Sequence, residues 1–327
     1  MSSLKNIAEH AGVSKTTVSF VLNGRGDEKN ISAETQKKVL DTAKLLNYQP
    51  NHLARSLSMG RSYTIGFVVP DISNPFFGKI ARLVERFAEE KKYSVMVAST
   101  DENPLKEQKI IESFRNRQID GIIIAPCSNV IDKMPSGTFP IVVFDRVYSN
   151  QSNSFVDINN KESASKLTKQ LIDKGNRRIG LISLTSYLPN ISQRIEGYKN
   201  ALADNAITID KTVIKELHSK PNKENVKSMM DQLLRGENPV TAILFLNNVC
   251  AAEGIWTVNR HYPDLLDQLQ FACFDNLDVF DYALPKVTSA LQPSEDIARS
   301  CVRMLFQQIE SKTASKGQRF STEIIKR

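Results

Sequence analysis

The sequence lacks the residue patterns that most enzymes and metal sites need. Its 327 residues include only four cysteines and four histidines, and these stand apart, without a C-x-x-C pair or the spacing of zinc ligands. P-loop and nucleophile-elbow patterns are missing. Gly24 and Gly26 follow a predicted helix rather than a strand, so they are no dinucleotide fingerprint. We expect no enzyme, no metal and no other cofactor; a Ser-His-Asp arrangement that only folding would assemble is the alternative.

Long apolar runs are also missing, and so is a secretory leader. The first residues include the acidic Glu9 and no apolar core of the signal-peptide type. No run approaches the length of a membrane span, so no membrane partner is expected. The scattered cysteines fit small buried thiols of a reduced, cytoplasmic protein (Cys127, Cys250, Cys273 and Cys301).

Positive charge is in excess and is concentrated near the N-terminus. The formal net charge is +7, and residues 1–60 contain eight Lys or Arg against five Asp or Glu, a net +3. Nearly half of the excess thus lies in under a fifth of the chain. An excess of this kind favours a polyanionic partner, because neutralised phosphates release their counterions. An ordinary solvated surface is the alternative.

The first fifty residues predict three short helices. Gly12 ends the first helix, Ser14 caps the second and Ser32 caps the third, which stops before Pro50. Each helix has one apolar face (Ile7, Ala8 and Ala11; Val18, Val21 and Leu22; Val39, Leu40, Ala43 and Leu46). The second helix leaves short polar side chains exposed at its start, which a DNA major groove can accept.

From Thr64 onward, apolar strand-like runs alternate with helical segments. One set of runs covers residues 64–69, 94–99, 121–125 and 141–145, and a second covers 178–184, 213–218, 241–246 and 269–275. Continuously apolar runs are typical of parallel strands that are covered on both faces. Two successive sets predict an α/β fold with two doubly wound parallel-sheet lobes, similar to periplasmic binding proteins, after a small all-α domain.

Three motifs in the correct order resemble the lactose-repressor-type (LacI) family of bacterial regulators. Residues 4–23 resemble the family's helix-turn-helix headpiece, N-H-L-A-R-S-L at 51–57 its hinge helix, and I-G-F-V-V-P-D-I-S-N-P-F-F at 65–77 the start of its effector-binding core. V-L-N-G-R-G-D-E, S-T-D-E-N-P and V-V-F-D-R are most similar to the sucrose- and fructose-responsive branch.

The resemblance implies a division of the chain into three parts. These are a helix-turn-helix DNA-binding headpiece over residues 1–48, a hinge helix and linker over 49–61, and an effector-binding and dimerisation core over 62–327. The core would comprise an N-subdomain of about 62–159 plus 290–318 and a C-subdomain of about 160–289 plus 319–327. The segment from Thr288 to Pro293 and the helix after Ser294 would cross back to the first lobe.

The resemblance also implies palindromic operator DNA as a partner, with the second helix in the major groove. Lys15 and Thr16 would read base edges, although a lysine can instead hold a phosphate. Phe20 departs from the family's commonest pattern, an arginine, and would either touch a thymine methyl or seal the helix. The remaining polar positions of this region would hold phosphates, with ordinary solvation as the alternative (Ser14, Thr17, Asn23 and Arg25).

The hinge helix would enter the minor groove of the operator. Asn51 would cap it, Ala54 would face the DNA, and Leu57 would be wedged into a base step. Packing of Leu57 against a dimer mate is the alternative. A helix this short does not persist alone in water, so we expect it to fold only when it is paired on DNA.

The resemblance places an effector site at the carboxyl ends of the strands. Its residues would be Phe76, Phe77, Asp145, Arg146, Arg194, Asn247, Asp275 and Gln292. Aromatic faces suit the C–H surface of a sugar, carboxylates and amides take hydroxyl groups, and two arginines would also take a phosphate or carboxylate. A structural pair between Asp145 and Arg146 is the alternative. Asn248 replaces an aspartate that is common in the family.

We therefore expect a dimeric transcriptional repressor of carbohydrate uptake or catabolism genes, bound to the nucleoid when it occupies its operator. A small sugar or sugar phosphate, related to fructose or sucrose, would control it by changing the angle between the lobes. No leucine heptads follow Arg327, so a dimer is expected rather than a tetramer. A sugar-binding protein without a DNA role and a sugar-active enzyme are the alternatives.

Overall fold

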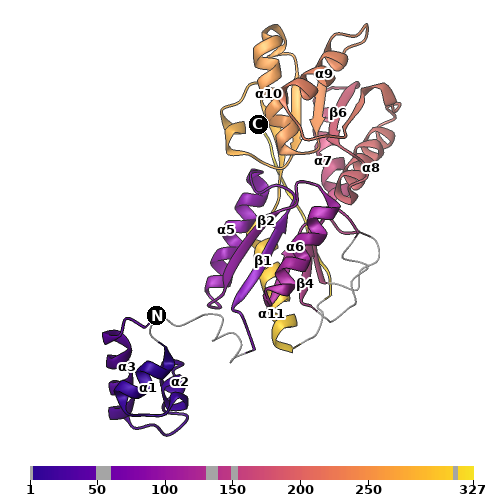
Figure 1. Cartoon of the computed structure of the whole chain (residues 1–327). Helices are drawn as coiled ribbons and strands as arrows, with labels where there is room; N and C mark the ends of the chain where they lie inside the picture. Colours follow the sequence, from indigo (N-terminus) through magenta and orange to yellow (C-terminus); the bar gives the residue numbers. More distant parts are fainter. Residues whose placement is uncertain (1–2, 49–59, 130–138, 149–153, 312–315) are drawn as a thin grey trace. The chain divides into compact units, whose positions relative to one another are not determined.

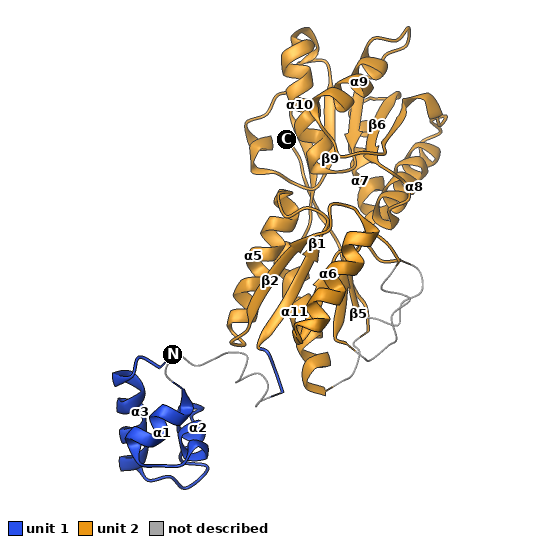
Figure 2. Ribbon diagram, viewed as in Figure 1, with its two compact units in different colours: residues 1–62 blue, residues 63–327 orange. Residues whose placement is uncertain are grey.

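The computed structural model describes residues 3–48, 60–129, 139–148, 154–311 and 316–327. They form two compact units, residues 1–62 and residues 63–327 (Figure 2). Each unit is considered by itself. Within the described ranges, no helix combines the length and the apolar character that crossing a bilayer requires.

The first unit is a bundle of three helices, α1 (Leu4–Ala11), α2 (Lys15–Leu22) and α3 (Ala33–Leu45). The serine before each helix accepts a hydrogen bond from a backbone N–H of the first turn, as the sequence predicts. Gly12 adopts a left-handed conformation, with φ of 65°, and ends α1. The prediction is wrong for Leu40, which is 44% exposed. Val39 and Ala43 are the residues of α3 that are buried in the core of the bundle.

The second unit contains two six-stranded sheets, one in each of two lobes (Figure 1). The first sheet has the order β11-β5-β4-β3-β1-β2, with all neighbours parallel. Its strands are β1 (Thr64–Val69), β2 (Ser94–Ser99), β3 (Gly121–Ile124), β4 (Ile141–Phe144), β5 (Ser154–Ile158) and β11 (Gln318–Phe320).

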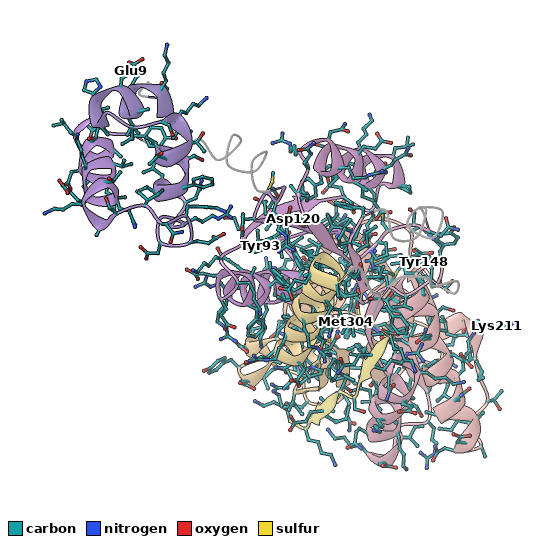
Figure 3. All side chains as sticks on the ribbon, turned by 90° about the horizontal axis from the view of Figure 1, so that it is seen from below. Glu9, Tyr93, Asp120, Tyr148, Lys211 and Met304 are labelled. Carbon is teal, nitrogen blue, oxygen red and sulfur yellow. The ribbon has the colours of Figure 1, made fainter. Side chains whose placement is uncertain are left out.

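Helices cover both faces of the first sheet. They are α5 (Pro75–Glu89), α6 (Pro104–Asn116) and α11 (Ser294–Ser311). Alternate residues of β1 point to opposite faces: Phe67 packs with α5 and α11, whereas Val68 packs with α6. On the α11 side, Tyr93 meets Phe306 edge-on with 4.7 Å between ring centroids, and Met304 lies in the same core cluster (Figure 3).

The second sheet has the order β12-β10-β9-β8-β6-β7, and only β12 runs antiparallel to its neighbour. Its strands are β6 (Ile179–Leu184), β7 (Ile214–Leu217), β8 (Ala242–Phe245), β9 (Gln270–Phe274), β10 (Val287–Leu291) and β12 (Glu323–Ile325). Helices α7 (Asn160–Asp173) and α8 (Pro189–Asp204) pack in one core cluster, and α9 (Lys223–Leu234) and α10 (Asn248–His261) in another. Short 3-10 helices cover Lys211–Val213, Pro263–Leu265 and Asp278–Asp281.

Within the described residues, the chain passes between the lobes three times: from β5 to α7, from β10 to α11, and from β11 to β12. All three passages run through the strands at one end of the two sheets, β5, β11, β10 and β12. The connections therefore act as a hinge along one edge. No connection crosses within the described residues at the opposite edge, near β1, β2, β6 and β7, where side-chain contacts join the lobes.

The predicted class, two doubly wound parallel-sheet lobes after a small helical domain, is confirmed. Three details differ. The apolar runs do not predict β5 and β11, because both short strands contain charged residues. β2 is an edge strand, and with Val97 48% exposed it is not covered on both faces. Val287–Leu291 is a strand of the second sheet, so the chain crosses after Leu291 rather than from Thr288.

Candidate nucleic-acid interface and ligand cleft

The exposed start of α2 is the candidate nucleic-acid interface of the first unit. Lys15 and Thr16 project from the first turn as exposed side chains. Ser14 and Thr17 are engaged with each other: the Ser14 hydroxyl oxygen accepts from the Thr17 N–H at 3.0 Å and lies 2.8 Å from the Thr17 hydroxyl. This cap fixes the backbone that carries Lys15 and Thr16, and it leaves these two side chains available for a groove.

The loop after α2 carries charge next to an aromatic ring. Phe20 is half-buried, and the cationic groups of Arg25 and Lys29 lie 5.7 Å and 5.5 Å from its ring centroid. Arg25 also donates two hydrogen bonds to Glu28, at 2.7 Å and 2.8 Å, and this pairing lowers the pKa of Glu28 to about 2. Asn23 donates its amide to the carbonyl of Ser19. Glu28 therefore competes with a phosphate for the Nε and Nη2 groups of Arg25.

The hinge positions of the sequence analysis lie outside the described residues. These are Asn51, Ala54 and Leu57. The interface that the structure describes is therefore the α2 region alone.

A cleft lies at the carboxyl ends of both sheets of the second unit. Its larger part is a cavity of about 320 Å³ between the start of α5, the loop after β9 and the passage from β10 to α11, lined by Pro75, Phe76, Lys79, Asp275, Asn276, Leu277, Asp278, Leu291, Gln292 and Ser294. A narrow recess continues past Phe76 and Gln292 to Asp145 and Asp157. The volume suits a small ligand, and the lining combines an aromatic face with carboxylates and amides.

Arg194 of α8 is the buried cation of the cleft. Its side chain is 3% exposed, and its guanidinium carbon lies 3.6 Å from the centroid of the Phe274 ring. It donates to the Asn160 side-chain oxygen and to the Leu246 carbonyl, both at 2.8 Å. Burial lowers its pKa, while the charge of Asp275 acts in the opposite direction. These contacts hold the guanidinium in one orientation.

Asp145 lies between two guanidinium groups. Its carboxylate oxygens are 3.7 Å from Nε of Arg146 and 3.8 Å from a terminal nitrogen of Arg194. It also accepts a hydrogen bond from the Asn190 amide at 3.2 Å. Asp145 directly follows β4 and has a positive φ of 62°. Left-handed aspartates are uncommon, and such backbone strain is often found at ligand sites.

Asp275 has the same position in the second lobe. It follows β9, has a φ of 80° and accepts a hydrogen bond from Gln292, which lies in the passage between the lobes. Burial raises the pKa of Asp275, and the positive charge of Arg194 opposes this shift. Asp275 therefore presents a desolvated acceptor at the wall of the 320 Å³ cavity.

Arg146 is buried beside Asp145, but its main partner is Glu102. Both terminal nitrogens donate to the Glu102 carboxylate at 2.7 Å. The alternative pair between Asp145 and Arg146 exists only as the longer 3.7 Å contact.

Four of the eight predicted effector residues do not line the cavities: Phe77, Arg146, Arg194 and Asn247. Phe77 belongs to the hydrophobic core, where its ring packs edge-on against Phe144. Asn247 caps α10 by accepting the N–H of Cys250 at 2.8 Å. Asn248, which stands where an aspartate is common, donates across the cleft to the Asn74 side-chain oxygen at 2.9 Å.

Sequence reasoning missed several polar residues that hold the cleft together. Glu102, Asp157, Asn160 and Asn190 each contact a predicted residue or line the recess. Burial raises the pKa of Asp157 to about 6, and the nearby charge of Asp145 adds to the shift. Glu102 follows a strand-like run and Asn190 lies one turn before Arg194, which are signals that could have found them, whereas Asp157 and Asn160 belong to the region of β5, which the apolar runs do not predict. Among the described residues, no group of three or more His, Cys, Asp or Glu is placed to hold a metal.

Known families match the two units separately. Residues 3–51 match the family described as "Bacterial regulatory proteins, lacI family", and residues 65–313 match the "Periplasmic binding protein domain". The second match covers more than half of the chain.

Relatives of established name match nearly the whole chain. It is 31% identical to the ribose operon repressor of Halalkalibacterium halodurans, over 95% of this chain and 92% of the relative. It is 30% identical to the sucrose operon repressor of Klebsiella pneumoniae, over 97% and 95%. A solved lac repressor dimer bound to operator and the anti-inducer ONPF has a TM-score of 0.86 at 19% identity, covering 100% of this chain and 98% of that chain, which supports the fold.

Proposed function

Because this chain belongs to the LacI family of bacterial regulatory proteins, and is thus a DNA-binding transcriptional regulator rather than an enzyme, we propose that it represses carbohydrate genes as a homodimer. The dimer binds a palindromic operator, and a small sugar in the cleft of the second unit controls this binding. The domain bounds are those of the sequence analysis, with a headpiece over 1–48, a hinge over 49–61 and a core over 62–327.

On the operator, the exposed first turn of α2 enters the major groove. Lys15 and Thr16 read base edges, and Phe20 contacts the groove or seals the helix. Ser14, Thr17, Asn23 and Arg25 hold the backbone phosphates. In the minor groove, Asn51 and Ala54 position the hinge helix and Leu57 opens a base step.

In the cleft, the sugar lies against Phe76 with its hydroxyl groups on the polar residues. Asp145, Asp275 and Gln292 accept or donate hydrogen bonds, and Arg194 orients both carboxylates. Arg146 and Asn247 support the site, and Phe77 supports Phe76, whose ring lies 5.1 Å from its own. The observation that carries this proposal is a connected set of buried charges: Asp275 lines the cavity of about 320 Å³, Asp145 lines the recess that continues it, and Arg194 lies 3.8 Å from Asp145.

Fructose or sucrose is the effector that the sequence motifs favour. The 30% identity to a sucrose operon repressor supports this choice, whereas the ribose operon repressor at 31% supports a pentose. Either sugar acts only if it binds the open and closed lobes with different affinity. Closure then changes the spacing of the two hinge helices and with it the fit to the operator.

The DNA role is tested by selecting tight-binding duplexes from a random pool with the full chain. Mobility shifts then compare the full chain with a chain that starts at residue 61. We expect a palindromic consensus that only the full chain binds. Failure to enrich any sequence, or equal binding by the truncated chain, would disprove the proposal.

The effector role is tested by titration calorimetry with fructose, sucrose and ribose, followed by mobility shifts at a saturating sugar concentration. We expect one sugar to bind and to change operator affinity at least tenfold. An Arg194→Met chain is the matched negative control, because it removes the cation that orients Asp145 and Asp275. A sugar that binds both chains equally binds elsewhere, which would contradict the assigned site.

A further inference from the structure

Glu102 accepts hydrogen bonds from both terminal nitrogens of Arg146. The two terminal nitrogens of Arg146 donate to separate oxygens of Glu102, each at 2.7 Å, in the parallel geometry that a guanidinium also uses for phosphate. The Arg146 side chain is 5% exposed, whereas the Glu102 side chain is 45% exposed, so Glu102 covers a buried guanidinium from the solvent side. The two terminal nitrogens of Arg146 are therefore already bonded and do not offer this bidentate geometry to an anion in the cleft.

The backbone that presents Glu102 is strained. Asp101 and Glu102 have φ values of 53° and 56°, which is rare for two consecutive residues other than glycine. The surrounding contacts hold this conformation: the Asp101 N–H donates to the Pro70 carbonyl at 2.8 Å, and Asn103 caps α6 immediately afterwards. Strain that is kept by such contacts is typical of residues that position a functional group.

The second arginine, Arg194, is also bonded to other groups and does not offer a phosphate a bidentate site. Arg194 donates to Asn160 and to the Leu246 carbonyl, and it faces Asp145 at 3.8 Å. Around Arg146 and Arg194 stand the carboxylates of Glu102, Asp145 and Asp275, and Lys79 and Asp278 add one charge of each sign at the cavity wall, so negative charge stays in excess. Bringing in a further dianion is unfavourable in a site of low dielectric constant.

Neutral hydroxyl groups, in contrast, find partners there. Nε of Arg146 and the Tyr148 hydroxyl are buried and make no hydrogen bond to any residue that the structure describes. Nε of Arg146 lies 3.7 Å from the carboxylate of Asp145, which lines the recess, so a sugar hydroxyl placed beside Asp145 can accept its hydrogen bond. Leaving such groups unpaired is costly, which favours a ligand that satisfies them.

We propose that Glu102 is a specificity-determining residue that holds Arg146 away from anions, so that the cleft accepts uncharged sugars and rejects phosphorylated ones. This inference rests on the proposed effector site. It selects one of the two ligand classes, sugar or sugar phosphate, that the sequence alone leaves open.

A first experiment uses inorganic phosphate, so it does not depend on which sugar is the effector. The thermal unfolding midpoint of the full chain is followed against phosphate concentration, with chloride at equal ionic strength as reference. For the unmodified chain we expect only the shallow, non-saturating rise that a kosmotropic anion gives a folded protein, and for Glu102→Gln an additional saturable rise with phosphate. The double variant with Arg146→Met should lose that rise, because the freed guanidinium is the anion site.

Glu90→Gln is the matched control. Glu90 is exposed at the far end of α5, about 22 Å along the helix from the cleft. Its substitution by Gln removes the same charge as Glu102→Gln. A saturable phosphate-dependent rise in the unmodified chain, or in Glu90→Gln as much as in Glu102→Gln, would overturn the proposal. So would a Glu102→Gln chain that folds and ignores phosphate.

A second experiment compares each sugar with its phosphate by calorimetry: fructose with fructose 1-phosphate, and ribose with ribose 5-phosphate. We expect the unmodified chain to prefer the uncharged member at least tenfold, and Glu102→Gln to reduce that ratio at least tenfold. Tighter binding of a phosphorylated sugar by the unmodified chain refutes the role of Glu102. It leaves the regulator itself intact, since operator binding in the mobility shift would still respond to that ligand.

Discussion

The ammonium group of Lys220 lies 2.5 Å from a carboxylate oxygen of Asp71, although the two residues belong to different lobes. Asp71 follows β1, and Lys220 follows β7, so the pair joins the edge opposite the three chain passages. Asn74 and Asn248 make a second contact between the lobes, from the same β1–α5 loop. Contacts at the edge opposite a hinge oppose its opening most effectively.

The Asp71–Lys220 pair should contribute a small, salt-sensitive coupling between the lobes. We expect a double-mutant cycle of Asp71→Asn and Lys220→Met to give about 0.2–1 kcal/mol in urea unfolding at low salt, and little at 0.5 M NaCl. Small-angle scattering should report a larger radius of gyration for Lys220→Met than for the control Lys199→Met on α8. Equal radii would mean that the pair does not hold the lobes together.

Removing Arg194 should destabilise the second unit strongly. Arg194→Met leaves Asp275 buried without its cation and leaves Asp145 only the 3.7 Å contact with Arg146, and loss of one partner in such a group costs about 3–5 kcal/mol. Urea unfolding at pH 7 measures the loss, with the exposed Arg115→Met on α6 as control. The cost should shrink as the pH falls, because burial raises the pKa of Asp275 and a protonated Asp275 no longer needs the cation. A cost below about 1 kcal/mol would show that Arg194 does not stabilise these carboxylates.

Asp157 should make stability depend on pH in the mildly acidic range. Burial raises its pKa from 3.8 to about 6, with Asp145 adding to the shift and Arg319 and Arg194 opposing it. The folded state thus binds more protons than the unfolded state between these values, and the free energy of unfolding falls as pH rises from about 4 to about 6. The full effect is on the order of 3 kcal/mol.

Asp157→Asn should abolish this dependence. The difference in free energy of unfolding between Asp157→Asn and the unmodified chain should increase from about pH 4.5 to about pH 7.5. The exposed control Asp204→Asn on α8 should show no such trend. Urea titrations at three pH values measure both variants. A constant difference across the range would mean that Asp157 keeps its ordinary pKa.

Lys15 should contribute sequence specificity to DNA binding. If it reads a base edge, Lys15→Ala costs about 1–3 kcal/mol on the selected operator and relaxes the preference at one base pair, with the salt slope nearly unchanged. Competition assays with single-base operator variants at several salt concentrations measure both quantities. Lys5→Ala on α1 is the control. If the slope of log K against log salt concentration falls by about 0.9 and the base preference is unchanged, Lys15 contacts a phosphate instead.

Glu28 should weaken DNA binding by occupying Arg25. Glu28→Gln releases the guanidinium from its two hydrogen bonds. We expect operator affinity to rise about two- to fivefold at low salt and the salt slope to steepen by up to about 0.9, because one more phosphate is neutralised. Glu34→Gln removes an equal charge from α3. If both variants raise affinity equally, net charge alone is responsible.

Local chemistry explains which parts of the structure could be predicted. Ser14 and Ser32 cap helices because their hydroxyls reach a backbone N–H three residues away, and this depends on nothing distant. The apolar runs of β1 and β3 predict buried parallel strands for the same reason. Leu40 shows the limit of this reasoning, since periodicity assigns it to the apolar face but the three-helix core is too small to cover it.

The sequence by itself determined the helical headpiece, the two α/β lobes and the place of the cleft, because caps, apolar periodicity and strand ends are local properties. Only the tertiary structure decided that Glu102 pairs with Arg146, that Phe77 packs in the core and that Val287–Leu291 stays in the second sheet. Partners 44 residues apart along the chain are selected by distance and desolvation in the folded state, and neither quantity exists in a linear sequence.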